Sequence, residues 1–257
     1  MIAAISEGSI RARLGAGKPL FNAWISLGLP FSVELAAEAG ADLVTIDLQH
    51  GMGGQAEMLG CLTAATAARL PALVRVAVND SGLISRALDA GAQGVICPMI
   101  NSAADAQAFV ASVKFPPAGA RSLGPYRARL ALPNYIGEAN GWTISCAQIE
   151  TKTAMDNLDD ILATPGLDMI CAGPNDLALT LSGGAHVDIR SAEVVAALDL
   201  LLAKCKETGV IATIFANDAD YAKSLIAKGW QIVAIASDAR WLSAGARAAR
   251  GVFDELA

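Results

Sequence analysis

WTISCAQIETKTAMDNLDDILATPGLDMICAG, residues 142–173, contains the pattern that decides the fold. An apolar run of strand length, WTISCAQIE (142–150), is followed by a helical stretch, TAMDNLDDILATPG (153–166), and then by a second apolar run, LDMICAG (167–173). Continuous apolar runs that alternate with helical stretches are typical of parallel strands covered by helices on both faces. The stretch therefore predicts a strand–helix–strand unit.

The same alternation repeats along the chain. Eight apolar runs of strand length occur, at residues 21–27, 42–48, 72–78, 94–100, 142–150, 167–173, 210–216 and 230–237. Alanine- or leucine-rich amphipathic stretches follow them, at residues 32–40, 54–70, 81–91, 102–114, 153–166, 191–209, 219–229 and 237–257. Several stretches contain or end in a glycine directly before the next strand, as is typical of a helix C-terminus followed by a short loop.

Eight strand–helix units predict an α/β protein with a single (β/α)8 TIM-barrel domain over residues 1–257. The length is near the ~250 residues typical of this fold. An open doubly wound sheet is the alternative, but no GxGxxG follows the first strand and no P-loop occurs, so it lacks its nucleotide-binding fingerprint. The stretches 115–141 and 182–190 are expected to be functional loops, the first of them long and following strand four.

The composition excludes several classes of protein. Hydrophobic residues make up 54% of the chain and charged residues 17%, which is not the composition of a disordered chain. The net charge is −6 and no basic stripe occurs, so nucleic-acid binding is disfavoured. No apolar run approaches the ~20 residues that span a bilayer. The five cysteines are scattered without CxxC spacing, which favours buried thiols in a reducing cytoplasm over disulfides or a zinc site.

Unusual polar residues gather at the predicted strand ends. Strand two ends in Asp47-Leu48-Gln49-His50, and strand three carries Arg75 in an apolar run. Strand five ends in Gln148-Ile149-Glu150, and strand six in Gly173-Pro174-Asn175-Asp176. The active site of a (β/α)8 barrel lies at the carboxyl ends of the strands, so these residues are expected to converge on one mouth.

Each of these residues also has a purely structural interpretation. Asp176 could be the N-cap of the next helix, and Glu150 a first-turn acid favoured by the helix dipole. Arg75 could form a structural salt bridge inside the barrel, since a buried guanidinium needs an anion. The glycine-rich loop around His186 offers no comparable context, so that histidine is expected to be solvated.

Glu150 and Asp176 are two carboxylates from adjacent strand ends, so they form an oxygen-ligand set. Such a set suits Mg²⁺, Mn²⁺ or a related hard divalent ion whose remaining positions are filled by water and substrate. A 2-oxo acid supplies two oxygens for such an ion. Arg75 could then help to stabilise a developing enolate, and His50 could move protons.

Several blocks resemble a known family: AGADLVTIDLQHG, ALVRV, RALDAGAQGVICPMI, RSLGPYRA, AQIET and PGLDMICAGPNDLA. Together they resemble the HpcH/HpaI family of class II pyruvate aldolases, in family order, from Trp24 to about Leu179. The resemblance implies a barrel that uses Mg²⁺, Mn²⁺ or Co²⁺ to cleave 4-hydroxy-2-oxo acids to pyruvate or hydroxypyruvate plus an aldehyde. It also implies a homo-trimer or homo-hexamer, in which a C-terminal helix at about 239–257 packs on a neighbouring subunit.

The resemblance further implies a role for each matching residue. Glu150 and Asp176 match the metal ligands, His50 the acid/base residue, and Asp89 the acid that raises the basicity of that histidine. Arg75 matches the residue that stabilises the transition state. The expected substrate-binding positions are Trp24, Gln148, Gly173, Pro174, Asn175 and Asp176. The chain departs from the common pattern in two places, with Gln49 where many members have Glu and Asn175 where Ala is common.

Other functions stay open at this point. A Schiff-base aldolase needs a lysine in a dry pocket, and only Lys152 lies near a strand end. A phosphosugar isomerase is disfavoured, because FANDAD and ASDAR after strands seven and eight offer no glycine-rich phosphate cradle. An oxaloacetate-type decarboxylase could use the same site, and a non-catalytic barrel scaffold is the alternative outside enzymes. The acceptor aldehyde is expected to meet the stretch 115–141 and a neighbouring subunit.

Overall fold

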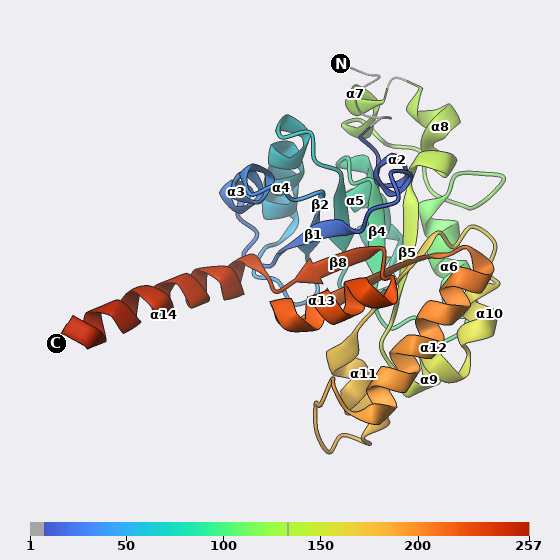
Figure 1. The fold of residues 1–257 in the computed structure, drawn as a ribbon. Coiled ribbons are helices and arrows are strands. Elements are labelled where there is room, and N and C mark those ends of the chain that lie inside the picture. The colour runs from blue at the N-terminus through green and yellow to red at the C-terminus, as the bar shows by residue number, and fades with distance from the viewer. Residues whose placement is uncertain (1–7, 133, 257) are drawn as a thin grey trace.

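The computed structural model describes residues 8–132 and 134–256. Its centre is a closed barrel of eight parallel strands in sequence order, β1 to β8, with β8 paired to β1 (Figure 1). The strands are β1 Leu20–Ile25, β2 Leu43–Asp47, β3 Ala72–Arg75, β4 Gly94–Cys97, β5 Ile144–Ile149, β6 Met169–Ala172, β7 Ile211–Ala216 and β8 Ile232–Ile235. The predicted (β/α)8 barrel is confirmed, and each strand lies within its predicted run or within one residue of it.

Helices surround the barrel. They are α2 Ile10–Leu14, α3 Pro30–Glu38, α4 Gln55–Ala67, α5 Ser81–Asp89, α6 Ala103–Val113, α7 Ala128–Ala131, α8 Tyr135–Trp142, α9 Lys152–Asp156, α10 Leu158–Leu162, α11 Pro174–Leu181, α12 Ala192–Thr208, α13 Ala219–Lys228 and α14 Asp238–Leu256. A large apolar core fills the space between the strands and these helices. Gly209 and Gly229 end α12 and α13 with positive φ angles of 74° and 102°, a conformation that favours glycine.

A second apolar cluster fills the inside of the barrel. Its members come from most of the strands and include Leu43, Leu73, Ile144 and Met169, all fully buried. Ile10 of α2 belongs to the same cluster, and its backbone N–H donates to Gln93 Oε1 at 3.0 Å. The short helix α2, which the sequence pattern did not predict, therefore closes the amino-terminal end of the barrel.

Residues 115–141 do not form the long loop that the sequence predicted beside the active site. This segment follows α6, and a helix that returns from a parallel strand delivers the chain to the amino-terminal end of the barrel. There it forms α7 and α8 around a small apolar cluster of its own, which includes Phe115 and Tyr135. Figure 1 shows α7 and α8 beside α2, at the end opposite α9 and α11. The segment therefore does not border the carboxyl ends of the strands in its own chain.

The last helix, α14, leaves the barrel as a long arm (Figure 1). Leu242, Val252 and Phe253 on this arm are exposed to 69%, 59% and 69%. Such apolar exposure is typical of a surface that meets a partner. Packing of α14 on a neighbouring subunit stays a prediction.

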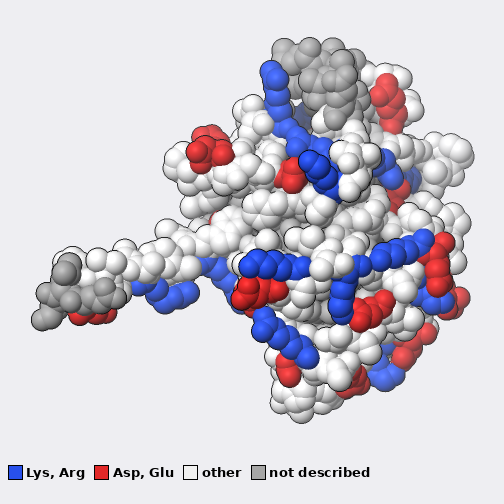
Figure 2. Space-filling view, in the orientation of Figure 1, with Lys and Arg blue, Asp and Glu red and all other residues white. Residues whose placement is uncertain are grey.

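The surface charges are mixed and the cysteine thiols are buried, as the sequence composition indicated. Over α12 and α13, basic side chains alternate with acidic ones instead of forming a single basic surface (Figure 2). The five cysteines are buried and free, and burial raises the pKa of Cys97, Cys171 and Cys205 to about 12. In the described part of the chain, no helix has the length and apolar character needed to span a bilayer.

Candidate active site

Most of the predicted site residues line a cavity of about 480 Å³ at the carboxyl ends of the strands, and the buried Glu150 lies behind Gln148 and Gly173 of its wall. Its walls come from the ends of several strands around the barrel. They include Trp24, His50, Arg75, Gln148, Gly173, Pro174, Asn175 and Asp176. The expected convergence on one mouth is therefore present in the structure.

Arg75 and Asp47 form a tight ion pair in this cavity. Arg75 Nε and Nη2 donate to the two carboxylate oxygens of Asp47 at 2.9 and 2.6 Å, because β2 and β3 place these residues side by side in register. The indole N–H of Trp24 donates to the same carboxylate at 3.3 Å. Burial by itself raises the pKa of Asp47, but the hydrogen bonds and charge of Arg75 outweigh it, so the pKa is lowered. The salt-bridge interpretation of Arg75 is thus correct, and the guanidinium still lines the cavity.

The His50 loop is anchored by the same carboxylate. The backbone N–H groups of Gln49 and His50 donate to Asp47 Oδ1 at 3.0 and 3.3 Å. Gly51 follows, where a Cβ would lie only 2.0 Å from the carbonyl oxygen of Asp47, so the turn requires glycine. The exposed His50 side chain lines the cavity. Asp47 therefore fixes both the guanidinium and the backbone of the imidazole-bearing loop.

Glu150 lies at the end of β5 with its carboxylate held on both sides. It is 2% exposed, and its Oε1 accepts the Met99 backbone N–H at 2.8 Å, while the Gln148 amide contacts Oε2. Burial is the largest cause that raises the pKa of Glu150, and the nearby charge of Asp176 raises it further. Glu150 precedes Thr151, which caps α9, so it is not the first-turn acid of a helix.

Asp176 lies in the first turn of α11, directly after β6. The N-cap of α11 is Gly173 and the helix begins at Pro174, so the N-cap interpretation of Asp176 was wrong. At Gly173 a Cβ would lie 2.7 Å from Glu150 Cβ and 2.9 Å from its Oε2, so only glycine permits the close approach of the two loops. Asn175 exchanges side-chain hydrogen bonds with Asn217 after β7, at 3.5 and 3.0 Å.

These residues fit a divalent ion with open positions, and not an all-protein cage. Within residues 8–132 and 134–256, no group of three or more His, Cys, Asp or Glu side chains is arranged to hold a metal. Two carboxylates from neighbouring strand ends repel each other, and a cation between them would relieve that repulsion. Gln148 Oε1 is also buried without a hydrogen-bond partner. A hard ion that keeps several waters, such as Mg²⁺, suits a pair of carboxylates of this kind.

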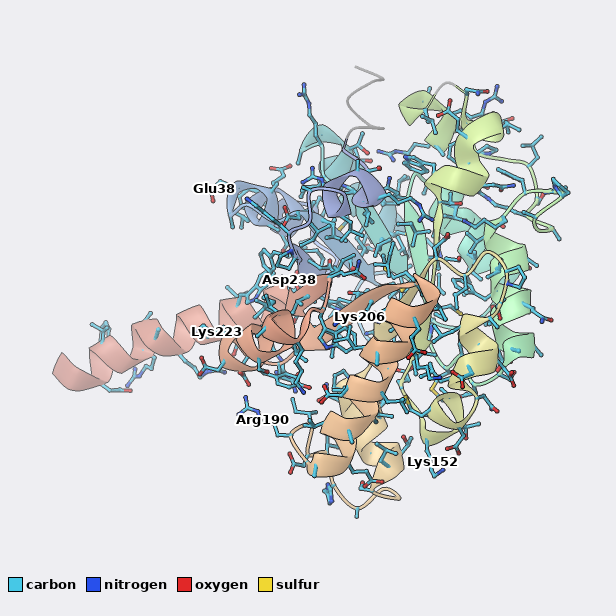
Figure 3. The ribbon with its side chains drawn as sticks, turned by 45° about the vertical axis from the view of Figure 1, so that its right-hand side comes forward. Glu38, Lys152, Arg190, Lys206, Lys223 and Asp238 are labelled. Atoms are coloured by element: carbon cyan, nitrogen blue, oxygen red, sulfur yellow. The ribbon has the colours of Figure 1, made fainter. Side chains whose placement is uncertain are left out.

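Two candidate residues lie outside the cavity. Asp89, the last residue of α5, borders a surface hollow between α4 and α5, and its carboxylate pairs with Arg121 at 2.7 Å. The structure therefore does not bring Asp89 to His50 within one chain. Lys152 is exposed on the outer side of the barrel, where its amine pairs with Asp156 at 2.7 Å (Figure 3). The structure thus gives a Schiff-base mechanism no lysine in the cavity among the described residues.

The sequence pattern did not single out several cavity residues. The sequence shows Asp47 only as a polar strand end, because its pairing with Arg75 depends on the register of β2 and β3. Phe215 of β7 packs edge-on against Trp24, with ring centroids 5.3 Å apart. Arg240 reaches the cavity from the first turn of α14. Phe215 and Arg240 could not be predicted as cavity residues, because a single apolar or basic residue near a strand end is common in any barrel.

A closed parallel barrel with carboxylate, imidazole and guanidinium groups at one mouth defines a (β/α)8-barrel enzyme. The family model for HpcH/HpaI aldolase/citrate lyase matches residues 21–244. The chain therefore belongs to the HpcH/HpaI aldolase/citrate lyase family, as the sequence blocks indicated.

Named relatives and solved structures agree with this assignment. The hydroxypyruvate/pyruvate aldolase of Rhizorhabdus wittichii is 35% identical over 239 residues, which cover 93% of this chain and 95% of the relative. The 4-hydroxy-2-oxo-heptane-1,7-dioate aldolase of Escherichia coli is 33% identical, with coverages of 94% and 93%. The crystal structure of a family protein from Burkholderia cenocepacia has a TM-score of 0.86 at 32% identity, over 100% of this chain and 99% of that one.

Proposed function

We propose that this protein is a class II aldolase that reversibly cleaves 4-hydroxy-2-oxo acids to pyruvate or hydroxypyruvate plus an aldehyde. The observation that carries the proposal is a carboxylate pair at the cavity that His50 and Arg75 line: Asp176 lines it, and the buried Glu150 lies directly behind Gly173 and Gln148 of its wall, close enough for the charge of Asp176 to act on it. The names of the relatives support the same reaction class. Carbon–carbon cleavage of this kind needs a stabilised enolate and a group that accepts the hydroxyl proton.

Glu150 and Asp176 would hold a divalent ion, Mg²⁺, Mn²⁺ or Co²⁺. When bound, the ion supplies positive charge next to the oxygen on which negative charge develops. Gln148, with its buried Oε1, and the backbone at Asn175 would orient the 2-oxo acid beside these carboxylates. Gly173 and Pro174 keep the loop close enough to Glu150 for that arrangement.

His50 and Arg75 would act on the substrate itself. The exposed imidazole can take the proton from the 4-hydroxyl group during cleavage and return it during synthesis. Arg75 Nη1 has no hydrogen-bond acceptor among the described residues, so it is free to donate to a substrate oxygen while Asp47 fixes Nε and Nη2. Trp24 would pack against the bound acid.

Assembly and location belong to the same proposal. Asp89 can raise the basicity of His50 only if it comes from a second copy of the chain, because within one chain it lies outside the cavity. A trimer or hexamer, held in part by the exposed arm α14, would supply that copy. Five buried free thiols suit a reducing cytoplasm.

The proposal is tested by assaying release of pyruvate or hydroxypyruvate from 4-hydroxy-2-oxo acids before and after treatment with EDTA. The expected result is activity that EDTA abolishes and that added Mg²⁺, Mn²⁺ or Co²⁺ restores. Full activity after EDTA treatment and dialysis would contradict the metal-dependent mechanism, and a covalent adduct trapped on Lys152 by borohydride would replace it.

A further inference from the structure

One positive charge at the cavity belongs to a residue outside the proposed aldolase machinery. Arg240, the third residue of α14, lines the cavity and is exposed. Among the described residues no carboxylate lies within ion-pair distance of its guanidinium, whereas Asp47 neutralises Arg75, the other arginine of the cavity. On a chain of net charge −6, an unpaired arginine in a ligand cavity calls for an anion.

The backbone around Arg240 is held in a fixed position. Before it, the buried Asp238 carboxylate accepts the Ser26 N–H and hydroxyl at 2.8 and 2.9 Å and the Leu27 N–H at 3.2 Å. After it, the indole N–H of Trp241 donates to the Ile235 carbonyl at 2.9 Å. Figure 3 shows Asp238 where α14 meets the barrel. The first turn of α14 is therefore part of the cavity wall, although the rest of the helix projects into solvent.

The barrel order places Arg240 on a different part of the cavity rim from the carboxylate pair, two strands beyond β6. Glu150 follows β5 and Asp176 follows β6, whereas Arg240 follows β8, and His50 follows β2 on the other side of β1. A substrate whose 2-oxo acid lies at Glu150 and Asp176 would extend its acceptor portion past His50 toward β1 and β8. The cavity of about 480 Å³ is large enough for a ligand longer than a three-carbon acid.

We propose that Arg240 binds an anionic group, a carboxylate or a phosphate, at the far end of the acceptor aldehyde. The natural substrate is then a 4-hydroxy-2-oxo acid with a second negative charge. The planar guanidinium matches both anions with paired N–H donors. This assignment rests on the proposed aldolase function, and it names the class of acceptor that the function leaves open.

The test is aldol synthesis from pyruvate or hydroxypyruvate with two matched pairs of acceptors. One pair is succinic semialdehyde and butanal, and the other is glyceraldehyde 3-phosphate and glyceraldehyde. The quantity compared is the ratio of kcat/KM for the anionic acceptor to that for its neutral partner. The variants are Arg240→Gln and Arg240→Lys, with Arg190→Gln as a control, because Arg190 is an exposed arginine that lines a separate hollow between α12 and α13.

Arg240→Gln should lower the ratio about 10-fold or more for at least one pair, since a hydrogen bond between charged groups is lost. Arg240→Lys should give a ratio between those of the wild type and Arg240→Gln, because lysine keeps the charge but not the paired donors, and Arg190→Gln should leave the ratio at the wild-type value. The pair that responds identifies the anion. An unchanged ratio for both pairs in an active Arg240→Gln enzyme overturns the assignment alone. A wild-type protein that joins no acceptor to either donor overturns the proposed function as well.

Discussion

Arg75 and Asp47 face each other from neighbouring strands and share two hydrogen bonds, at 2.9 and 2.6 Å, at the wall of the cavity. The same carboxylate accepts the backbone N–H of His50. One buried anion thus fixes the direction of the guanidinium and the start of the histidine loop. Asp47 acts through these neighbours, so it is a positioning residue.

The variant Asp47→Asn tests this relationship. It leaves Arg75 with a single weak acceptor, and breaking a buried ion pair costs about 3 kcal/mol of unfolding free energy. Denaturant unfolding monitored by circular dichroism should show that loss. Arg190→Gln removes an exposed pair with Asp218 and should cost less than about 1 kcal/mol. Equal losses in the two variants would contradict the role of Asp47.

The lowered pKa of Asp47 also gives the pH dependence of this effect. Its stabilisation is fully present above the ordinary aspartate pKa of about 3.9 and is lost as the pH falls through the lower pKa of the folded state. The difference in unfolding free energy between wild type and Asp47→Asn should therefore be constant above about pH 5 and shrink below about pH 4. A difference that stays constant down to the acid limit would refute the assigned pKa direction.

Gly173→Ala tests the packing beneath the carboxylate pair. The added methyl group would lie 2.7 Å from Glu150 Cβ, and so it must displace that side chain. We expect weaker metal activation, measured as a higher Mn²⁺ concentration for half-maximal activity. Gly141→Ala in α8, at the other end of the barrel, is the matched control, because no atom lies within 4 Å of its added Cβ. Similar metal activation curves for the two variants would show that Gly173 is not needed for the site.

The amino-terminal end of the barrel gives an independent stability prediction. The buried amine of Lys114 donates to Asp168 at 2.8 Å and to the Asn140 and Thr143 carbonyls at 2.9 and 2.7 Å. Lys114→Met removes the donor to these two carbonyls, whereas Arg11 and Ser145 still contact the Asp168 carboxylate, so it should cost about 1–3 kcal/mol of unfolding free energy. Lys152→Met breaks an exposed pair and should cost less than about 1 kcal/mol. Denaturant midpoints with unchanged m-values would measure both losses.

Replacing His50 should affect aldol cleavage and oxaloacetate decarboxylation differently, although both reactions would use the same site. We expect His50→Gln to slow aldol cleavage by about 10²–10⁴-fold, the usual range for loss of a general base. Decarboxylation of oxaloacetate needs no proton taken from a hydroxyl group, so its rate should fall far less. Parallel assays of the two reactions on one enzyme preparation provide the measurement. Equal losses in both reactions would mean that His50 holds the 2-oxo acid and is not the base.

The barrel itself could be predicted from the sequence, because each strand is a continuous apolar run and glycine marks the ends of helices such as α12 and α13. The stretch 115–141 was placed at the wrong end, because broken hydrophobic periodicity reports a loop but not the side of the barrel on which it lies. Only the order of strand and helix fixes that side. The helix α11 was missed because it is short and begins with Pro174-Asn175, which is also a turn signal.

The site was predictable where polar residues interrupt an apolar pattern, as at Arg75, Gln148 and Glu150. Asp89 could not be placed by pattern, since it ends an ordinary amphipathic helix and its carboxylate is taken by Arg121. Arg240 could not be predicted either, because an arginine in a helical stretch gives no indication that the helix begins at the cavity. Pairings such as Arg75 with Asp47 depend on strand register, which sequence pattern alone leaves open.

In the proposed site, Glu150 and Asp176 hold one divalent ion between them. Electron paramagnetic resonance measures the binding of Mn²⁺ without any turnover, because the signal of free Mn²⁺ disappears on binding. Titration of the metal-free protein should show one site per chain in the wild type, and strongly weakened binding in both Glu150→Gln and Asp176→Asn. Wild-type affinity for Mn²⁺ in either variant would contradict the assignment of that carboxylate, and wild-type affinity in both would remove the metal site from this cavity.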